Sequence, residues 1–178
     1  MNKLMVVGLT LALGTGLALA KGKTEVTGPI EAKSGSKLTG KYTLTQDGKK
    51  VKLKVTVEGA APEGEHAVHV HENPDCSDPD GKKAGGHWNP TTQPHGKWGH
   101  DGFHMGDVGN MKVGKDGKGE ITLETDKWTM GSGDAKTDVL GHAIIVHEKV
   151  DDFTTQPTGN AGNRIGCAVI PAAPPAAK

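Results

Sequence analysis

Hydrophobic and polar residues alternate along much of the chain with the period of two that β-strands show. Between residues 51 and 57 the sequence VKLKVTV places valine or leucine at every second position and lysine or threonine between them. Such alternation predicts a strand with one face in a core and the other in solvent. Residues 37–46 alternate less regularly, and Asp47-Gly48, a dipeptide typical of tight turns, separates the two segments. Together they predict a β-hairpin.

Further short segments have strand-like patterns, and Asp116-Gly117 predicts another turn between two of them. With the hairpin they make eight strands, which predicts an all-β fold, an antiparallel sandwich or flattened barrel. Two long connections, residues 72–103 and 148–164, interrupt the series, and loops of that length are usually functional or disordered. The other strands are expected at residues 24–32, 66–72, 104–113, 118–125, 142–147 and 165–170.

The N-terminal segment, MNKLMVVGLTLALGTGLALA, has one lysine, an apolar run and a small-residue end, which predicts a secretory signal peptide over residues 1–20. No later segment is long and apolar enough to span a bilayer, so the mature protein is expected to be exported, soluble and free of the membrane. Residues 21–170 are expected to form one domain. Residues 171–178, PAAPPAAK, are expected to be a disordered tail.

Composition narrows the function classes. The chain has 27 glycines, 10 prolines and only 3% aromatic residues, which favours short strands and many loops. Basic and acidic residues are nearly balanced, 21 of each in the full chain, so a broadly basic nucleic-acid surface is not expected. Cys76 and Cys167 are the only cysteines, and in an exported protein such a pair is most simply a disulfide. Metal ligation is the alternative for the pair, although neither cysteine has a C-x-x-C spacing.

The histidines carry the candidate chemistry. In a strand, His69 and His71 would point to the face opposite Val68 and Val70, close enough for both rings to bind one ion, although an exposed polar pair fits the same pattern. Imidazole suits zinc, copper, iron and nickel, and three imidazoles with a carboxylate suit zinc especially. The candidates are too many for one ion, and an imidazolate shared between two ions would account for them without being established by the count. The later ones are His87, His95, His100, His104, Asp107 and His147.

Five motifs, in order along the chain, resemble the copper,zinc superoxide dismutase family. They are HVHE at 69–72, GGHWNP at 85–90, HMGDVGN at 104–110, GHAIIVHEKVDD at 141–152 and GNAGNRIGCAVI at 159–170. The resemblance implies an eight-stranded antiparallel Greek-key sandwich or flattened barrel. It also implies one copper and one zinc per chain, and dismutation of superoxide to dioxygen and hydrogen peroxide as the metal alternates between Cu(II) and Cu(I).

The resemblance also implies roles for individual residues. Arg164 matches the arginine that holds the superoxide anion, and His87 would supply a proton as well as bridge the two metals. Asp151 matches a carboxylate that accepts hydrogen bonds from His69 and His95, and the disulfide would hold the loop against the segment that presents Arg164. His66 resembles a structural histidine, while His100 and His142 receive no role. Copper would be held by His69, His71, His87 and His147, and zinc by His87, His95, His104 and Asp107.

Two features resemble bacterial, periplasmic members of the family. The segment FTTQPTG after Asp152 is short and has no lysine or glutamate, and Cys76 follows the H-x-H motif closely. Lys82 and Lys83 are hypothesised to guide superoxide in place of that loop, with two solvated lysines as the alternative. A homodimer is left open. A non-catalytic metal carrier is the competing function, which the complete ligand set and Arg164 disfavour.

Overall fold

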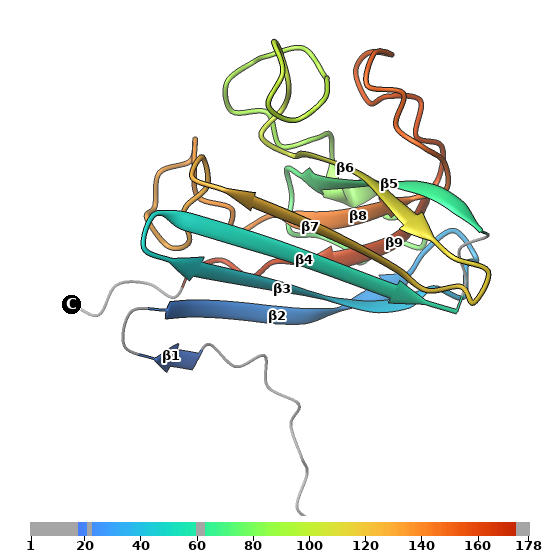
Figure 1. Cartoon of the computed structure of the whole chain (residues 1–178), viewed down its shortest axis with the longest axis horizontal. Coiled ribbons are helices and arrows are strands. Elements are labelled where there is room, and N and C mark those ends of the chain that lie inside the picture. Colours follow the sequence, from blue (N-terminus) through green and yellow to red (C-terminus); the bar gives the residue numbers. More distant parts are fainter. Residues whose placement is uncertain (1–17, 21–22, 60–62, 174–178) are drawn as a thin grey trace, which may run out of the picture.

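The computed structural model of the chain describes residues 18–20, 23–59 and 63–173. In this part of the chain nearly all regular structure is β (Figure 1). The elements are β1 (Ala18–Ala20), β2 (Lys23–Ala32), β3 (Thr39–Asp47), β4 (Lys50–Glu58), β5 (Gly64–His71), the 3-10 helix η1 (Lys82–Ala84), β6 (Asp107–Val113), β7 (Gly119–Thr125), β8 (Ala143–His147) and β9 (Arg164–Val169).

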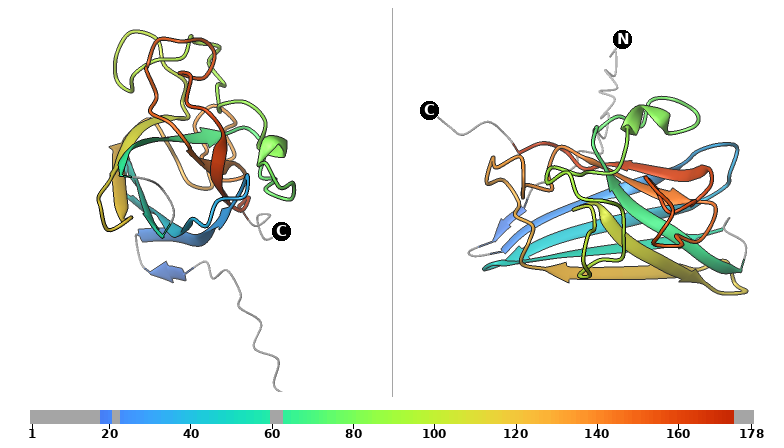
Figure 2. Two further views of the ribbon diagram at one scale, coloured as in Figure 1. Left: turned by 90° about the vertical axis from the view of Figure 1, so that its right-hand side faces the viewer. Right: turned by 90° about the horizontal axis from the view of Figure 1, so that it is seen from above.

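Strands β2 to β9 form a closed antiparallel barrel. Their order is β2-β3-β4-β7-β6-β5-β8-β9, and β2 also pairs with β9 through Glu31 and Cys167 and through Ala32 and Gly166. The ring is visible in the left view of Figure 2. Because β4 is not a neighbour of β5, and β7 is not a neighbour of β8, two connections cross the barrel end as in a Greek key. The predicted eight-stranded antiparallel fold is confirmed, as a closed barrel.

The strand boundaries differ from the predicted ones in one instructive place. β6 begins at Asp107 and not at residue 104, because the chain turns there: Asp107 N–H donates to the carbonyl of His104 at 3.1 Å.

A third long connection, residues 126–142, joins β7 to β8 and was not predicted from the sequence. The carboxylate of Asp138 organises it by accepting backbone N–H groups from Gly131, Gly133 and Leu140.

Parts of the predicted terminal segments lie outside the described residues. These are residues 1–17 of the expected signal peptide and residues 174–178 of the expected tail. The last three residues of the expected signal peptide form β1, which pairs antiparallel with β2. In the described part of the chain, no helix has both the length and the apolar character needed to cross a membrane.

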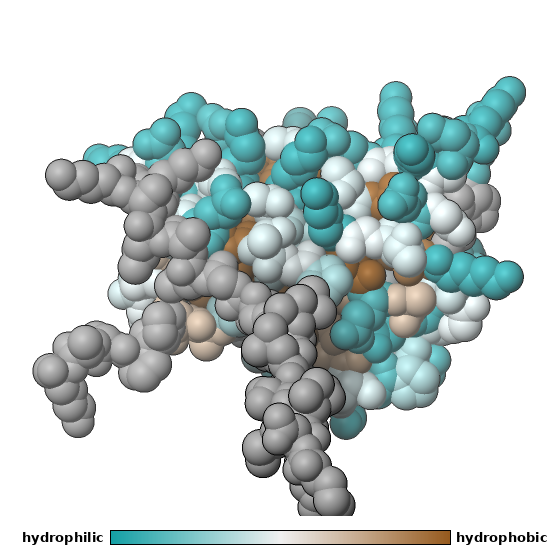
Figure 3. Space-filling model, turned by 90° about the horizontal axis from the view of Figure 1, so that it is seen from below, coloured by the Kyte–Doolittle hydropathy of each residue, from teal (hydrophilic) through white to brown (hydrophobic). Residues whose placement is uncertain are grey.

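The barrel wall follows the alternation of the sequence. Val51, Leu53 and Val55 of β4 are fully buried in the core, whereas Lys52 and Lys54 between them are exposed. Several outward lysines pair with glutamates of β7, as Lys54 does with Glu120 at 2.8 Å. The coloured part of the face seen from below in Figure 3 is mostly hydrophilic or neutral, with small hydrophobic spots.

Tyr42, the only tyrosine, makes a buried hydrogen bond between two strands of the barrel. Its side chain is 1% exposed, and its hydroxyl donates to the carbonyl of Val169 in β9 at 2.8 Å, past the intervening strand β2. Tyr42→Phe is expected to lower the free energy of unfolding by about 1 kcal/mol, since it removes one buried hydrogen bond and leaves a carbonyl unpaired. Urea denaturation measures this change, and an unchanged midpoint would show that the hydrogen bond contributes nothing.

Ionisation of the Tyr42 side chain should also lower the free energy of unfolding of the wild-type protein at alkaline pH. Burial raises the pKa of Tyr42 to about 12, so the neutral phenol is favoured in the folded state. As the pH rises from the unfolded value of about 10 toward that value, the unfolded chain loses the phenol proton first and stability falls. Tyr42→Phe should lack this part of the loss.

Candidate metal centre

Two long connections cover one side of the barrel, residues 72–106 between β5 and β6 and residues 148–163 between β8 and β9. They stand next to each other above β5, β6 and β8 (Figures 1 and 2). Beneath them, Val68 and Val70 of β5 face the core, and His69 and His71 face the loops. Both histidines are nevertheless fully buried. The predicted alternation of β5 is therefore confirmed, and the loops supply the burial that a strand alone would not.

A first group of buried imidazoles lies at the edge of the barrel. The ligand atoms of its four members lie within 4.8 Å of one another. An isolated β-bridge joins the backbones of His71 and His87, whose ring centroids are 5.0 Å apart, and His147 is the last residue of the neighbouring strand β8. The group consists of His69, His71, His87 and His147.

Hydrogen bonds determine which ring nitrogens of His69 and His71 keep a lone pair. Nε2 of His69 donates to Oδ2 of Asp151 at 2.9 Å, and Nδ1 of His71 donates to the carbonyl of Gly85 at 3.0 Å. A carboxylate or a carbonyl can only accept, so the lone pairs remain on Nδ1 of His69 and Nε2 of His71. Both of these nitrogens and Nε2 of His87 are buried with no hydrogen-bond partner, and so are the two nitrogens of His147, one of which can serve as a ligand atom. Because such groups are costly when unpaired, their convergence fits a bound cation.

The protonation of these rings also suits metal binding. Burial lowers the pKa of His71 and His147 well below the ordinary value, with smaller contributions from neighbouring histidines and from Arg164. Burial likewise lowers the pKa of His87 to about 4, against its hydrogen bond with Asp107. Neutral imidazoles keep a lone pair for coordination, and imidazole nitrogen is a good ligand for copper.

A second group shares His87 with the first. Nδ1 of His87 lies 2.8 Å from Oδ1 of Asp107, Nδ1 of His95 lies 3.0 Å from that oxygen, and Nδ1 of His104 lies 3.3 Å from it. Nδ1 of His104 is also 3.3 Å from Nδ1 of His87. Four ligands placed tetrahedrally at about 2.0 Å from zinc would be about 3.3 Å apart. The residues present therefore fit a zinc ion.

The carboxylate of Asp107 makes this group negative. Burial would raise the pKa of Asp107, but hydrogen bonds from His104, His87 and His95 outweigh it and hold the pKa far below the ordinary value. Burial would lower the pKa of His95, but the hydrogen bonds to Asp107 and Asp151 raise it to about 9. A site in which carboxylates favour a positive charge so strongly suits a divalent cation.

The carboxylate of Asp151 is hydrogen-bonded to one histidine of each group. One carboxylate oxygen accepts from Nε2 of His69 and the other from Nε2 of His95, each at 2.9 Å. Asn110 holds Asp151 in turn, because its side-chain amide bonds both the backbone N–H and the carbonyl of that residue. Asp151 is 1% exposed. Its position sets the tautomer of one histidine in each group.

Arg164 lies at the start of β9, opposite His147 of β8 in the strand register. Its guanidinium donates to the carbonyls of Gly81 and Gly85, both at 2.7 Å. A disulfide between Cys76 and Cys167 ties the same loop to β9. A hollow of about 440 Å³ beside the guanidinium is lined by Ser34, Asp80, Lys82, Gly162, Asn163 and Arg164.

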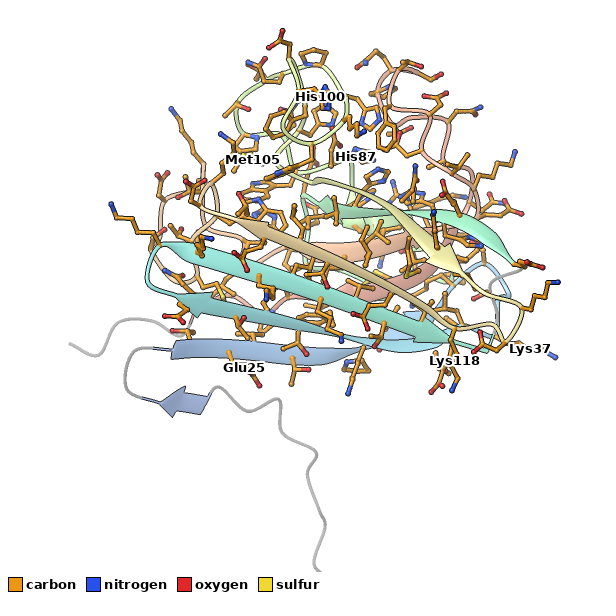
Figure 4. All side chains as sticks on the ribbon, viewed as in Figure 1. Glu25, Lys37, His87, His100, Met105 and Lys118 are labelled. Carbon is orange, nitrogen blue, oxygen red and sulfur yellow. A yellow bond between two sulfur atoms is a disulfide. The ribbon has the colours of Figure 1, made fainter. Side chains whose placement is uncertain are left out.

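The other predicted residues lie outside both groups. His100 is exposed, and Figure 4 shows it further out in the loop than His87. His142 bonds the carbonyl of Glu72 and packs on the ring of Trp88 at 4.6 Å. Nδ1 of His66 donates to the carbonyl of His147 at 3.0 Å, so His66 supports the end of β8.

The tryptophans pack with one another inside the molecule. Trp88 and Trp128 are buried, and their ring centroids are 6.1 Å apart. Trp98 lies partly buried against Trp128. Loop and core packing therefore explains these rings.

One residue near the site was missed from the sequence. The side chain of Gln156 accepts the backbone N–H of His95 and donates to its carbonyl, at 2.8 and 2.9 Å. It thereby joins the loop of residues 148–163 to the backbone of His95, a member of the second group. A single glutamine in a polar loop has no periodic signal that could have revealed this contact.

Comparison with known proteins gives a consistent result. Residues 38–170 match the model of the family described as copper/zinc superoxide dismutase. The chain is 33% identical to a superoxide dismutase [Cu-Zn] of Deinococcus radiodurans, over 97% of this chain and 99% of that one. It is 37% identical to the superoxide dismutase [Cu-Zn] of Caulobacter vibrioides, over 81% of this chain and 84% of that one.

Solved structures agree in fold. A superoxide dismutase-like protein from Bacillus subtilis superposes with a TM-score of 0.71 at 30% identity, covering 81% of this chain and 97% of that one. A double mutant of that protein gives 0.72, also at 30% identity, with coverages of 82% and 97%. With the barrel, the shared histidine and the match over most of the sequence together, the chain belongs to the copper/zinc superoxide dismutase family.

Proposed function

We propose that the protein converts two superoxide anions and two protons into dioxygen and hydrogen peroxide, with copper in the group of His69, His71, His87 and His147 and zinc in the group that contains Asp107. The observation that carries the proposal is the sharing of His87, whose Nε2 belongs to the first group and whose Nδ1 belongs to the second. Copper, when bound, would supply the one-electron chemistry between Cu(II) and Cu(I).

The chain's own residues would bind the anion and deliver a proton. Arg164 carries a planar cationic fork, and its charge reaches His71 and His147 of the first group. A superoxide anion beside that fork would be held next to the imidazoles. Nε2 of His87, which has no hydrogen-bond partner, could hold a proton for the developing peroxide whenever that nitrogen is not a metal ligand.

Metal analysis and a turnover assay test this proposal together. The purified protein should contain about one copper and one zinc per chain and should consume superoxide rapidly. Tight binding of both metals without turnover would contradict the enzyme and support a metal carrier.

Lys82 and Lys83 differ in their placement relative to Arg164. Lys82 lines the same hollow as Arg164, and its ammonium pairs with Asp80 at 3.0 Å. Lys83 bonds Ser77 and does not line that hollow. Guidance of superoxide is therefore proposed for Lys82 in particular.

Lys82→Glu is expected to lower kcat/KM about threefold at low ionic strength, with the difference fading above physiological salt. Lys83→Glu makes the same change in net charge a residue away and should have a smaller effect. Rates measured over a range of salt concentrations compare the two variants. Equal effects, or none, would mean that the position of Lys82 does not matter.

We further propose that residues 1–20 are a signal peptide cleaved before Lys21, and that the mature protein works in a bacterial periplasm. The disulfide supports export, and the short loop of residues 148–163 supports the bacterial type. Mass spectrometry of the exported protein should give Lys21 as the first residue. A homodimer remains a prediction that light scattering can decide.

A further inference from the structure

One buried charge has no part in the proposed function, the ammonium group of Lys33. Lys33 follows β2 directly and is only 8% exposed. Nζ donates to the carbonyl oxygen of Cys76 at 2.6 Å and pairs with the carboxylate of Glu31 at 3.3 Å. A lysine is almost never buried unless its charge is paired, because removing an ammonium from water is costly. The contact with Cys76 therefore needs an explanation in terms of the surrounding loop.

Cys76 is the residue at which the loop is tied twice. Its sulfur is bonded to Cys167 in β9, and its carbonyl oxygen is held by Lys33 at the end of β2. The next residue, Ser34, extends this contact, since its N–H donates to the carbonyl of Pro79 at 2.8 Å. The turn after β2 thus supports the loop from residue 76 to residue 79 independently of the disulfide.

The same loop supplies the carbonyls that hold Arg164. One of them belongs to Gly81, whose φ of +66° is a conformation that glycine adopts readily. A β-carbon at Gly81 would lie 3.6 Å from Cγ of Lys33 and 3.6 Å from Cβ of Arg164. The stems of both side chains therefore pack around Gly81, and a shift of the loop would move an acceptor of the guanidinium.

We propose that Lys33 is a positioning residue for Arg164. By holding the carbonyl of Cys76 and packing beside Gly81, it keeps the acceptors of the guanidinium in place and so limits where the bound anion lies. It acts through the loop, with no contact to the anion. This inference rests on the proposed role of Arg164 in binding superoxide, and the experiment separates the two.

The test compares Lys33→Met with Lys37→Met. Methionine keeps the unbranched stem of Lys33 and removes its ammonium group. Lys37 lies in the same connection between β2 and β3 but is exposed, pointing outward in Figure 4. Both variants therefore lose one positive charge. The measurements on the copper- and zinc-loaded protein are the metal content, kcat/KM, and the dissociation constant of azide from the visible spectrum of Cu(II).

Lys33→Met is expected to weaken azide binding and to lower kcat/KM, each about threefold, with both metals retained. Lys37→Met should match the wild type in azide affinity. Equal azide affinities in Lys33→Met and the wild type would overturn the inference.

A double-mutant cycle with Arg164→Ala locates any failure. If Lys33 acts through Arg164, Lys33→Met should have no further effect on azide affinity once the arginine is absent. Additive effects would contradict the inference and would mean that Lys33 acts by its own charge. If Arg164→Ala alone leaves azide affinity and rate unchanged, the proposed role of the arginine fails first.

A measurement on the wild-type protein covers the case in which Lys33→Met does not fold. The ammonium protons of Lys33, observed by NMR on nitrogen-15-labelled protein, should exchange with water more slowly than those of exposed lysines such as Lys37. Exchange as fast as that of the exposed lysines would show that the hydrogen bond to Cys76 does not persist, and the inference would be wrong.

Discussion

Replacing His147 by alanine is expected to abolish superoxide turnover. The imidazole of His147 is one of the four proposed ligands of the first group, and its nitrogens are buried without a hydrogen-bond partner. Removing it should weaken copper binding by at least about 100-fold, since even residues that only orient a ligand contribute up to about that much. The zinc group contains no atom of His147, so its affinity for zinc should fall much less than the affinity for copper. Metal analysis after dialysis and a superoxide assay measure the two effects.

His100→Ala is the matched control for this experiment. It also removes one imidazole, but His100 is exposed and belongs to neither group. It should leave copper content and turnover at the wild-type level. If His147→Ala retained both copper and turnover, the assignment of His147 as a ligand would be wrong.

The second large effect is expected from Asp107→Ala. Oδ1 of Asp107 lies among the ring nitrogens of the second group, and Oδ2 accepts the backbone N–H groups of Gly96 and His104, at 3.0 and 2.8 Å. The substitution therefore removes a ligand and an anchor of the loop together. Zinc occupancy should fall below about a tenth at stoichiometric zinc, and proteolysis between residues 95 and 104 should become faster.

Asp107→Asn separates the two contributions. Its carbonyl oxygen can still accept a backbone N–H, but it lacks the charge that favours a divalent cation. This variant should lose most of its zinc and keep more of the loop's protection from protease than Asp107→Ala does. Full zinc occupancy in Asp107→Ala would contradict the proposed ligand set.

The strands of the barrel could be predicted because the alternation that predicts them is local. Alternation in β4 predicts a strand wherever the segment lies in the fold, since side chains of a strand alternate between two faces. The connection of residues 126–142 was overlooked because it depends on Asp138, whose carboxylate gathers backbone N–H groups and has no periodic pattern. Closure of the barrel through the short β2–β9 pairing likewise depends on segments far apart in the sequence and has no local pattern.

Motif resemblance names candidate residues for the site, but it does not give the hydrogen bonds between their atoms. Motif resemblance names His69 and Asp151, but the hydrogen bond between them joins residues 82 positions apart and decides which nitrogen of His69 stays free. The contacts of Lys33 and Gln156 are even harder to predict from the sequence. Each is a single polar side chain hydrogen-bonded to the backbone of another segment, and the neighbouring residues contain no pattern that predicts it.

The shared ring of His87 and the shared carboxylate of Asp151 have a thermodynamic consequence for metal loading. An ion in either group orders residues that the other group also needs, so the two binding equilibria are linked. Linkage is reciprocal: the factor by which bound zinc raises the affinity for copper must equal the factor by which bound copper raises the affinity for zinc. A shortage of either metal would therefore weaken the binding of both.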